Sequence, residues 1–275
     1  MAAKTYYWTN DDGDNDFQNP TGDDWLEAAG TAAGAGVYPG SAQADHIVLP
    51  SYAAGALVAG SADHGNQSAN ANGVTNLTIE DGFEQAVGTR EHPLYLYMAG
   101  SPAWSFESSV HGDLWFVTGT AAVASLAIIR AKSGSEIHLV FGAAAATLVN
   151  VSAGEVYFDA DCFGVSTSGI TTLNIGAQPT GQAPTVYVAG AVATLNLYGG
   201  TVEWLKGTLT AVNQFGGTFR CGKSVSARTC TTFIKYGGET DFRTGKPGVL
   251  TFTNAVQYKG GIMPVFDIGE SLQRS

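Results

Sequence analysis

Short runs in which apolar and polar residues alternate recur along most of the chain. The runs Thr185-Val186-Tyr187-Val188 and Thr194-Leu195-Asn196-Leu197 change character at every position. This is the period of a β-strand that buries one of its two faces. The pattern predicts an all-β protein built from many short strands.

The strand unit repeats at a spacing of about 22 residues. A propeller blade needs about 40 residues, and a leucine-rich repeat needs a consensus that this chain lacks. The spacing fits one turn of a parallel β-solenoid, in which three short strands stack on those of the next turn. We therefore predict a right-handed β-helix. The equivalent positions that define the repeat are Leu77, Leu126, Leu148, Leu173, Leu195, Val212, Phe233 and Val256.

Paired glycines punctuate the repeat and predict its corners. Glycine adopts positive φ without a Cβ clash, so a pair lets the chain turn sharply. If Gly199 and Gly216 hold positive φ, valine at either position should cost more than about 1 kcal/mol of stability. The predicted corner residues are Gly199, Gly200, Gly216, Gly217, Gly237 and Gly238.

Aromatic residues accompany the glycine pairs. They are Tyr198, Phe215 and Tyr236, directly before a pair, and Tyr258, one place earlier. Stacked turns would align these rings in a ladder. We interpret the ladder as a structural device, with a sugar-binding platform as the alternative.

Residues 1–74 differ from the repeat region. They contain aspartates, small residues and prolines, and only Ile47-Val48-Leu49 and Ala56-Leu57-Val58 have the character of strands. We predict an N-terminal cap or docking region at 1–74, a solenoid of about eight turns at 75–262, and a C-terminal tail at 263–275. Caps are expected because the end turns of a solenoid expose unpaired strand edges.

Charge and composition exclude several classes of function. The chain has 13 Lys and Arg against 24 Asp and Glu, a formal net charge of −11, so it would repel nucleic acids and anionic membranes. A hydrophobic content of 44% argues against disorder. No apolar stretch approaches the roughly twenty residues of a membrane span, and the start lacks the apolar core of a signal peptide. We expect synthesis in the cytoplasm and no membrane partner.

The N-terminal region follows a known pattern. It comprises residues 8–20, Asp23-Asp24-Trp25, Pro39-Gly40 and Asp45-His46-Ile47-Val48-Leu49. The arrangement resembles the tryptophan-bracketed opening of β-helical virion proteins of tailed bacteriophages, with Phe17 in place of the usual second tryptophan and Asp24-Trp25 in place of Asn-Trp. The resemblance covers about 50 of the 275 residues. It implies a solenoid virion component, often trimeric, and no catalytic residues.

Carboxylates are the only groups in the repeats that suggest catalysis. Glu155, Glu203 and Glu239 follow the corners of their copies, so two or more could align on one outer face together with Asp159, Asp161 and Asp241. A glycosidase needs two carboxylates about 5–9 Å apart. Cationic residues are scattered, so we favour a solvated face over an active groove.

Metal and thiol chemistry have little support. The cluster Asp11 to Asp16 fails the EF-hand spacing, which favours a solvated turn over a cation site. The five histidines are dispersed. We interpret Cys162, Cys221 and Cys230 as reduced core or turn residues, with a Cys221–Cys230 disulfide as the alternative. We expect no metal and no cofactor.

These observations favour a structural virion protein that decorates or cements a capsid. We expect a homotrimer on the capsid surface, bound to the major capsid protein and made in the host cytoplasm. Trp8, Phe17 and Trp25 are the predicted docking anchors, and a cap folded over the first solenoid turn is the alternative role for these rings. The alternative functions are a tailspike-like protein that binds or cleaves polysaccharide, and a bacterial adhesin.

Overall fold

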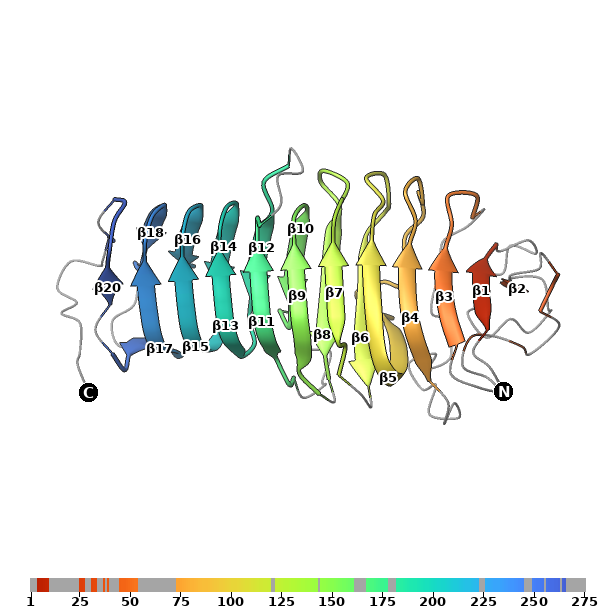
Figure 1. Ribbon diagram of the computed structural model, residues 1–275, viewed down its shortest axis with the longest axis horizontal. Coiled ribbons are helices and arrows are strands. Elements are labelled where there is room, and N and C mark those ends of the chain that lie inside the picture. Colours follow the sequence, from red (N-terminus) through yellow and green to blue (C-terminus); the bar gives the residue numbers. More distant parts are fainter. Residues whose placement is uncertain are drawn as a thin grey trace.

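The protein is a parallel β-solenoid in the computed structural model, and Figure 1 shows its strands side by side along one long axis, from β1 at one end to β20 at the other. No helix occurs in the described part of the chain. The prediction of an all-β solenoid is confirmed. The structure describes residues 4–9, 25–27, 31–33, 37, 39, 45–53, 73–119, 122–142, 144–160, 167–177, 182–222, 226–244, 249–254, 256–262 and 264–265.

The strands are short, as the alternating pattern requires. They are β1 (Thr5–Trp8), β2 (Trp25–Glu27), β3 (Asp45–Leu49), β4 (Val74–Ile79), β5 (Leu94–Phe106), β6 (Leu114–Gly119), β7 (Ser125–Ile128), β8 (Glu136–Phe141), β9 (Ala146–Val151), β10 (Glu155–Phe158), β11 (Ile170–Ile175), β12 (Thr185–Val188), β13 (Val192–Leu197), β14 (Thr201–Trp204), β15 (Gly207–Gln214), β16 (Thr218–Cys221), β17 (Arg228–Lys235), β18 (Glu239–Asp241), β19 (Leu250–Phe252) and β20 (Gln257–Tyr258).

Parallel pairing arranges these strands in two long faces. Face A contains β3, β4, the second half of β5, β7, β9, β11, β13, β15 and β17, each paired with the next. Face B contains β6, β8, β10, β12, β14, β16 and β18. The long strand β5 joins the faces, because its first half pairs with β6 and its second half with β4 and β7.

The pairing of neighbouring face A strands is interrupted at one position. In β11 and β13, Ile170 pairs with Val192 and Thr172 with Thr194, while the residues between these pairs, Thr171 and Ala193, are skipped. In the last turn the two segments separate, because β19 pairs with the start of β17 and β20 with its end. Over most of the stack each turn therefore has two strands where three were expected, and the pairing of the face A strand is interrupted once.

The predicted register is correct over most of the repeat. Leu173, Leu195, Val212 and Phe233 occupy one row, paired from turn to turn. Leu148 was expected in that row, but Val149 takes the place. Val149 and Val151 point into the core and fix the phase of β9, which leaves Leu148 on the outer side.

The parallel stack begins earlier than the predicted boundary at residue 74. Strand β1 pairs in parallel with β3, and β3 with β4, so the predicted Ile47–Leu49 strand belongs to the stack. On its other side β1 pairs antiparallel with β2. The predicted Ala56–Val58 strand and most of the 263–275 tail lie outside the described residues.

The glycine pairs form the corners between face A and face B, and the two glycines of each pair differ. The second glycine has positive φ, as in Gly200 at +77°. The first, Gly199 or Gly216, lies outside the positive-φ region, so a valine there would meet no φ strain. At Gly200 an added Cβ would also lie 2.3 Å from the carbonyl oxygen of Pro184. The second glycine therefore excludes a side chain both because its φ is positive and because an added Cβ would clash with the backbone of the neighbouring turn.

One corner offers a matched pair of substitutions. We expect Gly200→Ala to lower the free energy of unfolding by more than about 1 kcal/mol, because it combines φ strain with a backbone clash. Gly199→Ala should change it by less than about 0.5 kcal/mol, since the nearest atom to its added Cβ is 3.7 Å away. Urea unfolding followed by circular dichroism measures both. Equal losses of stability would contradict this account of the corner.

Candidate functional site

The two N-terminal tryptophans lie in the core. Trp8 in β1 and Trp25 in β2 are completely buried, and their rings meet edge to face with centroids 5.0 Å apart. Neither ring is available to a partner in this conformation, which is the position expected of a cap over the first turn. Phe17, the third predicted anchor, lies outside the described residues.

The ladder of exposed rings exists, but it is shorter than expected. Tyr198, Phe215 and Tyr236 stack in parallel with ring centroids 5.0 Å apart, and each residue is about 45% exposed. Tyr258 is out of the row, because it pairs with Lys235, one position before Tyr236. Each inner ring face is covered by the next ring, so mainly edges meet solvent. A sugar-stacking platform needs open ring faces, and this arrangement therefore fits the structural interpretation.

A second aromatic row crosses face B and was not predicted. Trp115, His138, Tyr157 and Tyr187 stack nearly in parallel, with centroids 3.5, 4.4 and 4.3 Å apart. The register of β6, β8, β10 and β12 places these side chains directly opposite one another. His138 is 3% exposed between its two flanking rings.

Two carboxylates flank this row. Glu136 and Glu155 are paired in register on β8 and β10. A Glu136 oxygen lies 2.8 Å from His138 Nε2, and the Tyr157 hydroxyl donates to Glu155 at 2.7 Å and to Glu136 at 3.5 Å. Burial, followed by the hydrogen bond to Glu155, raises the pKa of Tyr157 above its usual range, so the phenol remains a donor at neutral pH. We call Glu136, His138, Glu155 and Tyr157 the face B cluster.

The predicted carboxylate alignment differs from the observed one. Glu155 and Glu239 share a row but are separated by the turns of β12, β14 and β16, and Glu203 occupies the neighbouring row, where it follows Tyr187. The true neighbour of Glu155 is Glu136. The sequence contains a usable signal, because Glu-x-His at 136–138 and Glu-x-Tyr at 155–157 put the same polar pair on successive strands.

The face B cluster can offer carboxylate oxygens to the hydroxyl groups of a ligand. Adjacent strands are about 4.8 Å apart, so the two carboxylates are close enough in principle for acid–base work. The Tyr157 hydroxyl, however, hydrogen-bonds to both, and His138 holds Glu136. Beyond Tyr187 the row continues with Glu203 and Arg220, whose charged groups lie 3.4 Å apart. The outer face thus satisfies much of its own hydrogen bonding.

Asp159 directly follows β10 and has an unusual backbone. Its φ is +54°, the one described non-glycine residue with positive φ, and the residue is 1% exposed. Its Oδ1 accepts the amide of Phe141 at 3.1 Å. Burial raises its pKa to about 6. Asp159 is therefore a corner residue that titrates just below neutral pH.

A polar network replaces the aliphatic side chains of one core row near the C-terminal end. Gln214 and Lys235 continue the inward row of Leu197 and are completely buried. Lys235 Nζ donates to the carbonyl oxygen of Gly238 at 2.6 Å and to Thr240 Oγ1 at 2.9 Å. Burial lowers the pKa of Lys235. Thr240 in turn donates to Gln214, so the network is closed within the core.

Cys221 and Cys230 are free thiols in the core, as predicted, and they do not form the alternative disulfide. Burial raises the pKa of each to about 12, which makes both unreactive at neutral pH. Cys162, Asp161 and the Asp11 to Asp16 cluster lie outside the described residues. Within the described ranges, no group of three His, Cys, Asp or Glu side chains is placed to bind a metal ion. In the same ranges no helix is long and apolar enough to span a membrane.

Comparison of the chain with protein-family models, with curated proteins and with solved structures finds no match. The functional argument therefore rests on the residues and their geometry.

A substitution of Trp8 distinguishes the two roles considered for Trp8 and Trp25, a cap over the first turn and a docking anchor. We expect Trp8→Ala to lower the free energy of unfolding by about 3–5 kcal/mol, because it empties a fully buried site. Tyr7→Ala, on the half-buried outer side of the same strand, is the matched control and should cost less. Urea unfolding measures both. A stable Trp8→Ala variant that no longer bound capsids would contradict the cap and support docking.

Asp159 gives a pH-dependent prediction. Because burial raises its pKa from 3.8 to about 6, the folded protein holds a proton there that the unfolded chain loses, and stability falls as pH rises through 6. Asp159→Asn keeps the acceptor and tolerates the positive φ. Its stability advantage over the wild type should grow by roughly 2 kcal/mol between pH 4 and pH 8.

Thermal or urea unfolding across that pH range measures the difference. Asp81→Asn is the control, since that carboxylate is 58% exposed. A stability difference for Asp159→Asn that stays constant with pH would contradict the assignment.

Proposed function

We propose that the protein is a non-enzymatic structural component of a tailed-bacteriophage virion, which decorates or cements the capsid as a homotrimer bound to the major capsid protein. The N-terminal resemblance supplies the virion context. One structural observation carries the rest: the outward side chains of both faces bind one another, as in the Tyr198–Phe215–Tyr236 ladder and the face B cluster. Such rows stiffen a rod and leave few polar groups for a substrate.

The fold suits this role because its stability is distributed along the axis. Each turn is held by the turns on either side through parallel backbone pairing, and one uninterrupted core runs through the stack. Such a body tolerates contact with a large partner without a change in shape. The N-terminal end, where β2 covers β1, is the end that we propose lies nearest the capsid.

The second candidate is a tailspike-like protein that binds or cleaves polysaccharide. The specific observation in its favour is the pair Glu136 and Glu155 on adjacent strands, with the Tyr157 hydroxyl between them. This role would place a few copies on the tail. It would also require the Tyr157 hydrogen bonds to open for the carboxylates to act on substrate.

Quantitative mass spectrometry of purified virions distinguishes the two candidates. Decoration predicts hundreds of copies per particle, and the purified protein should sediment with capsids that lack it. Its solution mass from light scattering should be three times that of one chain.

Two results would overturn the proposal. A handful of copies per particle would place the protein on the tail. Release of reducing sugar from host polysaccharide by the wild type, lost in Glu155→Gln, would make it an enzyme.

A further inference from the structure

Four asparagines form a hydrogen-bonded ladder along the outer side of face A. They are Asn150, Asn174, Asn196 and Asn213, paired in register on β9, β11, β13 and β15. The Nδ2 atoms of the last three each donate to the Oδ1 of the preceding asparagine at 2.9 Å. The sequence separations are 24, 22 and 17 residues, so the ladder is kept while the turn length varies. All amide dipoles point the same way.

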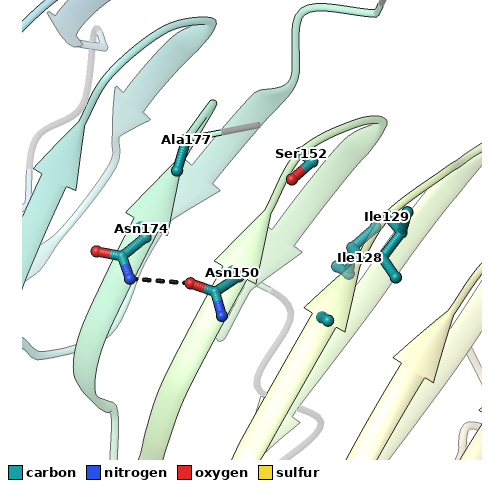
Figure 2. Close-up of a pocket in the computed structure, with 7 residues that line it drawn as sticks. Ile128, Ile129, Asn150, Ser152, Asn174 and Ala177 are labelled. Atoms are coloured by element: carbon teal, nitrogen blue, oxygen red, sulfur yellow. Dashed lines mark hydrogen bonds between the residues drawn. The ribbon is translucent and has the colours of Figure 1, made fainter. Parts of the chain in front are cut away.

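The ladder ends at Asn150 with an amide that has donors to spare. The next position in register is Ala127 on β7, whose methyl group cannot accept a hydrogen bond. The structure gives Asn150 Nδ2 no acceptor among the described residues. Figure 2 shows this nitrogen on the side of Asn150 away from Asn174. Aligned amides strengthen one another's hydrogen bonds, so this terminal donor is the polarised end of the chain.

A hollow of about 190 Å³ lies where the next rung would be. Its walls combine the amides of Asn150 and Asn174 with Ser152 and with apolar groups of Ile129 and Ala177 (Figure 2). The remaining lining residues are Ala127 and Ile128. No lining residue carries a charge, so the hollow suits a neutral ligand. Its volume corresponds to roughly six water molecules, which exceeds that of a single carboxamide group.

We propose that this hollow binds the acetamido group of a neutral N-acetylated sugar. The acetamido carbonyl oxygen takes the place of the missing asparagine Oδ1 and accepts from Asn150 Nδ2. The acetyl methyl group lies against Ile129 and Ala177, and the sugar ring fills the rest of the hollow. The proposal is independent of the virion role, because it rests on different residues.

Two single substitutions test the proposal, and each introduces one asparagine, at opposite ends of the ladder. Ala127→Asn adds a rung at the hollow, occupies part of it and gives Asn150 an internal acceptor. Ile234→Asn adds a rung at the opposite end, where Ile234 pairs with Asn213, and leaves the hollow untouched. Thermal unfolding shows that each variant is folded. If Ala127→Asn does not fold, Asn150→Asp serves instead, because it removes the donor and still accepts from Asn174.

Saturation-transfer NMR on the full chain measures binding, with N-acetylglucosamine as the probe and glucose as the control lacking the acetamido group. We expect the strongest transfer at the acetyl methyl group of N-acetylglucosamine and none to glucose. Ala127→Asn or Asn150→Asp should weaken binding at least tenfold, while Ile234→Asn should bind as the wild type does.

Three results would overturn the proposal. They are equal binding of glucose and N-acetylglucosamine, full binding by Ala127→Asn, and binding of an asparagine-containing peptide in place of the sugar. The last would assign the hollow to a protein side chain.

Discussion

The close approach of successive backbones at the glycine corners is the constraint on which the molecule depends. A Cβ on Gly217 would lie 2.5 Å from the carbonyl oxygen of Gly200 in the turn below. Because each corner lies directly on the previous one, the strands on both sides of it start in register. The Tyr198–Phe215–Tyr236 ladder, whose rings directly precede the glycine pairs, is aligned by this contact.

Residues of the same type stack in register from turn to turn, so a change of residue in one turn alters the contacts of the residues directly before and after it in the row. Where asparagine follows asparagine, the side chains of the row hydrogen-bond to one another. Where the row changes, as at Ala127, it leaves a hollow and a spare donor. The change from Leu197 to Gln214 in the core row instead requires a buried network, which Lys235 and Thr240 complete. The spare donor of Asn150 and the buried polar network of Lys235 therefore both lie where the residue type changes within a row.

The fold was predictable from the sequence because it depends on alternation and glycine, and both are local signals. Leu195 and Val212 were recognisable as equivalent since each stands at the same distance before a glycine corner. Leu148 was misplaced because Leu148 and Val149 are both apolar, and only their neighbours decide which one is buried. The face B cluster was harder to predict, since β8 and β10 are joined through a complete turn and Glu136 has no glycine pair beside it. Lys235 resembles a surface residue in the sequence, and only the three-dimensional arrangement reveals the acceptors that its ammonium group binds.

The strands at the two ends of the stack determine how identical rods can meet. At one end the three-residue β2 runs antiparallel to β1, and at the other β20 is only two residues long. Among the described residues, a second copy placed end to end would meet a reversed strand at one end and a two-residue strand at the other. Short or reversed edges of this kind block strand addition. The described part of the rod therefore has a polarity, with a reversed strand at one end and a two-residue strand at the other.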